Sequence, residues 1–246
     1  IKMYVSTRCV FPGFTITWLS GMNEPKNSPT TLFPKLTPEL IKELGLEKGV
    51  EGSMSAFLLE AEGKTVMIII RSTDVITTEW SGGTTTQLAI SPEGAVYADR
   101  DFDWRLSTAE VNDEKSTFTP LPDYNRFLTI RKGSLRLKHD GGEWYDIGEG
   151  DVAEFDGGSL TESEGKVTDY NLMVRKGKIR GSLDTEFLDA GETVFMGDVE
   201  KSKVTAIYLS RGSGLGVFCN GKKAADLHEG DLLVFEEADF GKERMT

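Results

Sequence analysis

The side chains that could do chemistry lie mostly in short segments in which polar and apolar residues alternate. The first of these side chains is an arginine. In Arg126-Phe127-Leu128-Thr129-Ile130, Arg126 shares one face of an extended strand with Leu128 and Ile130, because side chains alternate along a strand. A guanidinium on an apolar face stays charged and needs an anion beside it. That anion is either Asp169, in a structural salt bridge, or the carboxylate of a ligand.

A second segment carries a polar pair. Asp169 and Asn171 share a face with Met173, while Tyr170 and Leu172 take the other face. A carboxylate and a carboxamide beside a flexible apolar side chain suit the lining of a small pocket. They equally suit a buried hydrogen-bonded network that holds two parts of the fold together.

Arg105 and Ser107 alternate with Trp104 and Leu106, so the two polar residues share a face. They belong to the candidate site if that face is enclosed. If Trp104 packs in the core, Arg105 points outward and is simply hydrated.

Trp80 stands before the hydroxyl-rich run Ser81-Gly82-Gly83-Thr84-Thr85-Thr86, which leads to Gln87. We interpret this as an aromatic wall next to polar groups, or as a plain hairpin loop anchored by the tryptophan. The complete set of predicted ligand-binding residues is Trp80, Gln87, Arg105, Ser107, Arg126, Asp169 and Asn171.

No metal, cofactor or catalytic residue is predicted. A metal-dependent site of the common type needs about three imidazoles and a carboxylate, and the chain has two histidines, His139 and His228, both expected in surface turns. The chain also lacks a Gly-x-Ser-x-Gly elbow, and neither Cys9 nor Cys219 has a neighbouring histidine in sequence.

Composition excludes several classes of protein. The 28 basic and 40 acidic residues give a net charge of −12, which disfavours nucleic acid and anionic lipid as partners. No apolar run approaches the ~20 residues that span a bilayer. Two cysteines are too few for a disulfide framework, and the N-terminus lacks the pattern of a signal peptide. We therefore expect a cytoplasmic protein.

The elements that position these residues are predicted to be strands. After residue 53, β-branched and aromatic runs alternate with glycine, aspartate and asparagine clusters, the pattern of an antiparallel sandwich or barrel. One helix is predicted over residues 37–45, with Thr37 as N-cap, Pro38 at the first helical position and Gly45 as the stop.

The β region contains an internal repeat. Residues 146–155 align with residues 226–235 at an offset of 80 with five identities, and the same offset carries Arg131 onto Arg211 and Leu135 onto Leu215. Each copy reads as strand, glycine turn, strand and a Glu-Gly-Asp turn. We predict two copies of one β-barrel module.

Such glycine-punctuated copies resemble the cupin jelly roll, and a tandem pair resembles an RmlC-like bicupin. Five segments also resemble the HutD/Ves family in order and spacing: Met67-Ile68-Ile69-Ile70-Arg71-Ser72, Trp80-Ser81-Gly82-Gly83-Thr84-Thr85-Thr86-Gln87-Leu88, Trp104-Arg105-Leu106-Ser107-Thr108-Ala109-Glu110-Val111, Pro122-Asp123-Tyr124-Asn125-Arg126 and Asp169-Tyr170-Asn171-Leu172-Met173-Val174-Arg175. The family usually has Asn-Gly-Gly-Gly after the tryptophan and Glu in place of Gln87. The resemblance implies a bacterial role in histidine utilisation or stress response, without an established reaction.

Three domains are predicted: an N-terminal α+β extension (1–66), a first cupin module (67–160) and a second (161–246). The extension is similar to the opening of metallo-β-lactamase-fold hydrolases, but it lacks their His-x-His-x-Asp-His metal motif. The fold class is thus all-β, a duplicated double-stranded β-helix with a small extension.

We expect a metal-independent protein that binds a small anionic or amide-bearing metabolite through the predicted site. By resemblance, the metabolite is a formylated or formiminated glutamate. Two alternatives stand beside this function. One is a metal-free cupin enzyme with Asp169 or Glu110 as acid or base, and the other is an interaction protein that forms a homodimer through an open sheet edge.

Overall fold

Strands make up almost all of the regular secondary structure in the described part of the chain. The structure, a computed structural model, describes residues 2–10, 54–58, 65–189, 193–196, 204–212, 214–219 and 222–237. Within these ranges there is one short 3₁₀ helix, η1 (Tyr97–Asp99), and no α-helix. No helix there is long and apolar enough to cross a membrane. The predicted helix at 37–45 lies outside the described residues. The fold is nearly all-β, as the short β-branched runs predict.

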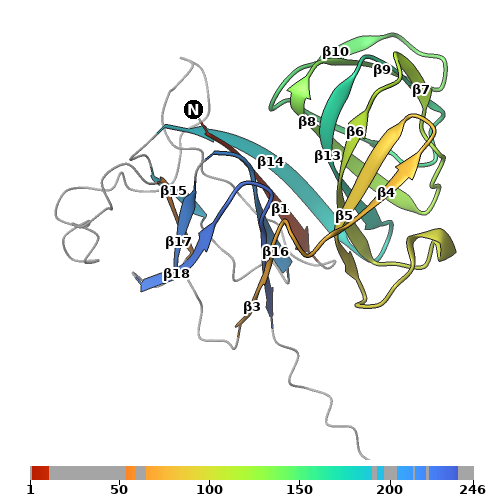
Figure 1. Cartoon of the computed structure of the whole chain (residues 1–246). Helices are drawn as coiled ribbons and strands as arrows, with labels where there is room; N and C mark the ends of the chain where they lie inside the picture. The colour runs from red at the N-terminus through yellow and green to blue at the C-terminus, as the bar shows by residue number, and fades with distance from the viewer. Residues whose placement is uncertain are drawn as a thin grey trace, which may run out of the picture.

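Two sheets, called sheet I and sheet II, form the first half of the fold (Figure 1). In spatial order, sheet I consists of β11 (Val152–Asp156), β8 (Tyr124–Gly133), β13 (Val167–Arg175), β6 (Trp104–Val111), β5 (Gly83–Ser91) and β4 (Ile76–Trp80). Sheet II consists of β10 (Tyr145–Ile147), β9 (Leu135–His139), β12 (Thr161–Glu164) and β7 (Lys115–Thr117). All these strands pair in antiparallel fashion.

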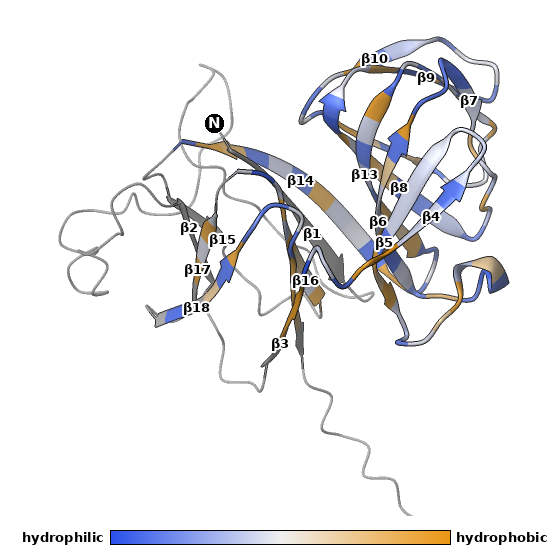
Figure 2. Ribbon diagram, viewed as in Figure 1, coloured by the Kyte–Doolittle hydropathy of each residue, from blue (hydrophilic) through white to orange (hydrophobic). Residues whose placement is uncertain are grey.

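Two more sheets, called sheet III and sheet IV, form the second half. Sheet III consists of β14 (Arg180–Leu188), β1 (Lys2–Val10), β16 (Val204–Arg211), β19 (Leu232–Glu237) and β3 (Thr65–Ile70). Sheet IV consists of β15 (Thr193–Met196), β2 (Met54–Leu58), β17 (Leu215–Cys219) and β18 (Lys222–Leu227). Figure 2 shows hydrophobic and hydrophilic residues in turn along β14, the pattern of a strand with two different faces.

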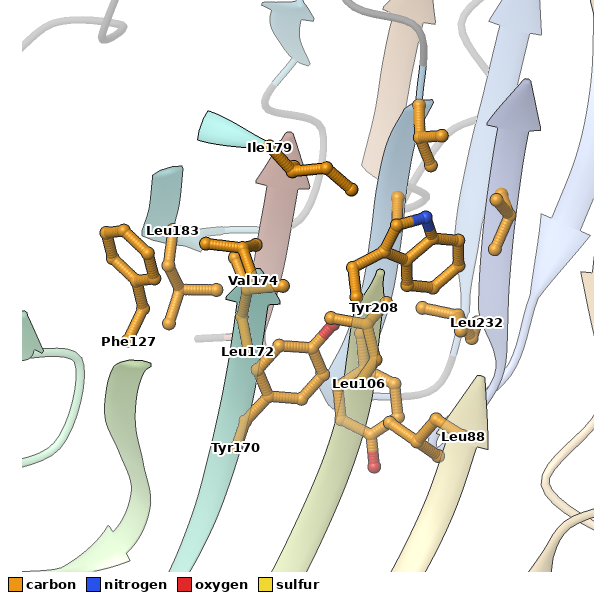
Figure 3. Packing of buried hydrophobic residues seen from close by; sticks show 14 residues of the cluster. Leu88, Leu106, Phe127, Tyr170, Leu172, Val174, Ile179, Leu183, Tyr208 and Leu232 are labelled. Atoms are coloured by element: carbon orange, nitrogen blue, oxygen red, sulfur yellow. The ribbon is translucent and has the colours of Figure 1, made fainter. Parts of the chain in front are cut away.

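The four sheets stack in the order II, I, III, IV through three apolar cores. Leu128 and Ile130 of sheet I pack with Leu137 of sheet II, and Ile207 of sheet III packs with Val217 of sheet IV. Between sheets I and III, side chains from β5, β6, β8 and β13 meet those from β14, β16 and β19 (Figure 3). The buried strands of sheet I, β6, β8 and β13, and strand β16 of sheet III are therefore covered on both faces.

Tyrosines mark the contact between the two halves. The rings of Tyr170 on β13 and Tyr208 on β16 stack with their centroids 5.1 Å apart. Arg131 reaches across to the second half, where its Nε donates to Ser210 Oγ (2.8 Å) and its guanidinium carbon lies 4.9 Å from the Tyr208 ring. Stacked aromatics and a cation above a ring both add to the apolar burial at this contact.

The turns of the internal repeat have the same hydrogen bonds in both halves. Asp151 donates its N–H to the carbonyl of Gly148, and Asp231 donates to that of His228; Gly150 and Gly230, which precede these aspartates, both have φ of 87°. Strands β8, β9 and β11 begin 80 residues before β16, β17 and β19, respectively. A positive φ of this size favours glycine, which explains why Glu-Gly-Asp recurs.

The N-terminal strands complete the second half. β1 lies between β14 and β16 and is antiparallel to both. In the first half, β13 has the same position between β6 and β8 and is likewise antiparallel to both. β2 takes in sheet IV the place that β12 has in sheet II, but it runs parallel to β15 and β17. The described parts of residues 1–66 thus belong to the sheets of the second half.

This placement predicts that β1 is structurally required. Val5 pairs with Thr185 on one side and Tyr208 on the other. Val5→Pro removes a backbone donor from the middle of a sheet and is expected to lower the free energy of unfolding by about 3 kcal/mol or more, measured by urea denaturation. Val5→Thr keeps the β-branched side chain and is the control. Equal stability of the two variants would contradict the pairing.

Candidate functional site

Buried polar residues gather on the face of sheet I that looks toward sheet II. Arg126 is 7% exposed and lies on the side of β8 that carries Leu128 and Ile130, both members of the core between these sheets. The intervening Phe127 points into the core shared with sheet III. The predicted facing of Arg126 is confirmed.

Strand register arranges the predicted residues in adjacent rows across sheet I. One row contains Ile90, Arg105, Met173, Arg126 and Phe155 in neighbouring strands. The next row contains Gln87, Ser107, Asn171, Leu128 and Ala153, and the third contains Thr85, Ala109, Asp169 and Ile130. Directly opposed residues share a face, so six of the seven predicted residues come together.

Trp80 is the residue that the structure does not bring to this cluster. It ends β4 opposite Gly83, whose partner on β6 is Val111, at the far corner of the sheet from Arg126. Its indole is 41% exposed and donates to Thr85 Oγ1 (3.1 Å). The geometry is that of a hairpin anchor.

Arg105 is buried, 6% exposed. The alternative in which a buried Trp104 turns Arg105 toward solvent is wrong, because sheet I has no solvated face at this strand. Its Nε donates to Gln87 Oε1 (2.9 Å) and a terminal nitrogen donates to Ser107 Oγ (3.0 Å). The Tyr97 ring lies 4.2 Å from its guanidinium carbon. Burial is the main cause that lowers the pKa of Arg105.

Arg126 is the least compensated charge of the cluster. Its Nε has no hydrogen-bond partner within the described chain, and its guanidinium carbon lies 4.8 Å from the Phe118 ring and 5.3 Å from the Phe155 ring. Burial lowers the pKa of Arg126 to about 10, although Tyr97 and Asp169 oppose the shift. Two aromatic rings stabilise a cation less than a paired anion does.

Asp169 does not form an ion pair with Arg126. Its Oδ1 accepts the backbone N–H of Ala109 (3.1 Å), and the side chain is 6% exposed. Burial raises the pKa of Asp169 to about 7, while the Ala109 hydrogen bond, Arg126 and Arg131 counteract this rise. At neutral pH the carboxyl group therefore exists in both protonation states, and the protonated form can donate a hydrogen bond.

Asn171 lies between these charges, and its Oδ1 has no hydrogen-bond partner among the described residues. Its row places it beside Ser107 and one step from Arg105 and Arg126. A buried amide oxygen without a donor costs free energy. The cluster thus presents one free acceptor, one poorly paired cation and one titratable acid to the same enclosed space.

Four residues near the cluster were not predicted: Tyr97, Phe118, His139 and Phe155. His139 was assigned to a surface turn, but it ends β9 and is half-buried. Its Nδ1 pairs with Thr161 Oγ1 (2.9 Å), its Nε2 pairs with Tyr145 Oη (2.8 Å), and its ring lies 4.8 Å from that of Phe155. Burial lowers the pKa of His139.

Sequence signals for these residues differ. Phe155 alternates with exposed residues in β11, so strand pattern could have found it. Tyr97 lies in η1, outside any alternating run. His228 fits its assignment to a turn, because its side chain is 72% exposed.

The described residues contain no group of three histidine, cysteine, aspartate or glutamate side chains that could hold a metal ion. Near His139, Asp140 favours a positive charge, whereas Arg126, which lies beside the same Phe155 ring, opposes one. The donor set of this cluster suits an anion.

A cavity of about 500 Å³ lies elsewhere, at the edge of the contact between the two halves. Its lining residues are Asn125, Phe127, Glu154, Gly177, Ile179, Arg180 and Gly181. Glu154 and Arg180 are exposed there, so water already solvates their charges. We prefer the buried cluster as the candidate site because its charge has no such solvation.

The pKa of Asp169 predicts how stability depends on pH. The folded state holds the proton up to about pH 7, whereas an unfolded aspartate loses it near pH 4. Stabilisation by this group is therefore complete below about pH 4 and is lost as pH rises to about 7, at up to about 1.4 kcal/mol per pH unit.

Asp169→Asn removes this titration and keeps an oxygen that can accept from Ala109. Between about pH 4 and 7, its free energy of unfolding should fall less than that of the wild type. Urea denaturation at several pH values measures this difference, with the exposed Asp123→Asn as control. If both variants followed the wild-type pH dependence, Asp169 would not titrate in this range.

Comparisons with known proteins agree with this fold. A HutD structure from Pseudomonas fluorescens SBW25 is 22% identical, with a TM-score of 0.54 over 69% of this chain and 86% of that one. A conserved protein of unknown function from Pseudomonas aeruginosa PAO1 is 20% identical, with a TM-score of 0.53 over 70% of this chain and 87% of that one. A search of curated proteins found no match. The HutD family model matches residues 72–245. The chain belongs to the HutD family.

Proposed function

We propose that the buried cluster binds a small anionic or amide-bearing metabolite without a metal, in the space between sheets I and II. The observation that carries the proposal is the Arg126 guanidinium, which is 7% exposed and has an unpartnered Nε. A buried charge of this kind is costly unless an anion completes it. A ligand carboxylate supplies that anion in a bidentate, charge-assisted hydrogen bond.

Each neighbour has a distinct part in this binding. Arg105 is held by Gln87 and Ser107, so its position is fixed before the ligand arrives, which reduces the entropy lost on binding. Asn171 Oδ1 is free to accept an N–H from the ligand. Asp169 in its protonated form can donate to a second ligand oxygen.

Family membership supports one class of ligand for this proposal. The HutD family is associated with histidine utilisation, and a formylated or formiminated glutamate carries both carboxylates and an N–H group. We infer a bicupin in which the first half of the fold, containing sheets I and II, binds this ligand and reports its concentration. Between sheets III and IV, the described residues include no equivalent of Arg126: Thr205 stands opposite Phe235 where Arg126 stands opposite Phe155.

The ligand class can be tested by thermal shift. Formylglutamate, formiminoglutamate, urocanate and glutamate are each added to the wild type, with and without divalent metal. A ligand at about 100 times its Kd should add about 2.7 kcal/mol, or roughly 5–10 °C in Tm. We expect a shift that is independent of metal, abolished in Arg126→Met and retained in Arg180→Met. Loss of the shift in Arg180→Met alone would place the ligand in the open cavity instead.

Stability without ligand separates a binding arginine from a structural one. Arg126→Met keeps an unbranched side chain between Phe118 and Phe155 and removes an unpaired buried charge. The unfolding free energy of this variant should stay within about 1 kcal/mol of the wild type or exceed it. A loss of about 3 kcal/mol or more in urea denaturation would show a structural ion partner.

A second candidate function is acid–base catalysis, and the pKa of Asp169 favours it. A carboxyl group with a pKa of about 7 can both take and release a proton at neutral pH. Glu110, the other acid considered, is exposed. Turnover of a bound ligand by the wild type, lost in Asp169→Asn while binding persists, would identify an enzyme.

A further inference from the structure

Strand β4 is an edge of sheet I with no protection against pairing. Its partner on one side is β5, and no described strand pairs with its other side. All five residues from Ile76 to Trp80 are exposed, and the register with β5 runs without a bulge. Natural edge strands are usually protected by lysine, proline or a bulge. β4 has none of these, and its one charge is Glu79.

The hairpin geometry determines which backbone groups point outward. Trp80 and Gly83 close a two-residue turn, and the closing pair of such a hairpin is hydrogen-bonded. Bonding then alternates along the strand, so Ile76, Thr78 and Trp80 direct their backbone groups toward β5. Thr77 and Glu79 direct their N–H and C=O groups away from the sheet.

Two copies of β4 can pair with each other about a twofold axis that passes through Thr78. In antiparallel pairing of two copies, Ile76 lies opposite Trp80, Thr77 opposite Glu79 and Thr78 opposite Thr78. The outward groups of Thr77 and Glu79 then form hydrogen-bonded pairs. Ile76, which is 74% exposed, and Trp80, which is 41% exposed, meet in the non-hydrogen-bonded pairs, where side chains come closest. The two Glu79 carboxylates do not face each other.

We propose that β4 pairs with β4 of a second copy of this chain, so that sheet I continues through a twofold axis into its partner. The occupant is a second copy because a single register satisfies both the outward backbone groups and the two exposed apolar side chains. The contact is small, so the dimer is reversible and depends on concentration. This inference is independent of the proposed ligand.

A charge-pairing experiment tests this edge. Thr78→Asp places two aspartates opposite each other at the axis, and Thr78→Lys places two lysines there. Sedimentation of the full chain from about 1 μM to about 500 μM should show dimerisation of the wild type. Each variant alone should weaken dimerisation at least tenfold, and an equimolar mixture of the two should restore it, because like charges repel and opposite charges attract across the pair.

Thr119→Asp and Thr119→Lys are the matched controls, because Thr119 is equally exposed but lies in the loop between β7 and β8. They should dimerise as the wild type does. A wild type that is monomeric at every concentration would overturn the proposal, and so would dimers that tolerate Thr78→Asp. Circular dichroism of each variant verifies that the fold is retained.

Discussion

The strands β6, β8 and β13 of sheet I are covered on both faces, and the candidate site depends on this constraint. The face that looks away from sheet II packs against sheet III through Phe127, Tyr170 and Leu172. A polar side chain on that face therefore cannot reach solvent. Alternation then directs Arg105, Arg126 and Asp169 into the space facing sheet II. The same burial that holds the two halves together removes water from the charges. Burial of sheet I therefore determines both where the cluster lies and how strongly its charges act.

The cluster is positively charged inside a protein with a net charge of −12. Two buried guanidiniums have one buried carboxyl group near them, and that group is half-protonated near neutral pH. Fully exposed charges would be screened by salt and water, but these are not. The contrast makes the proposed anionic ligand compatible with an acidic protein, because the local field at the buried cluster, rather than the overall charge, would act on it.

Strand alternation predicted most of this arrangement from sequence. It placed Arg126 with Leu128 and Asp169 with Asn171, because the period of a strand is fixed by its backbone. It left two positions open for Arg105, in the site or in solvent, since a local pattern does not show whether a second sheet covers that face. Trp80 was misplaced because its closeness to Gln87 in sequence does not show how far apart the two residues lie along the β4–β5 hairpin. Tyr97 lies in a 3₁₀ turn without a period, and the partners of β1 lie too far along the chain for any local rule.

The distance between β1 and its partners has a consequence for the order of folding. Val5 pairs with residues about 180 and 200 positions later, whereas β4, β5 and β6 pair with close neighbours in sequence. During synthesis the local pairs of sheet I can form early, but β1 must wait until β16 has left the ribosome. Until then β1 lacks its β16 partner, and until β14 has been made it lacks both partners. The second half of the molecule is therefore the slower to assemble and the more exposed to aggregation while the chain is being made.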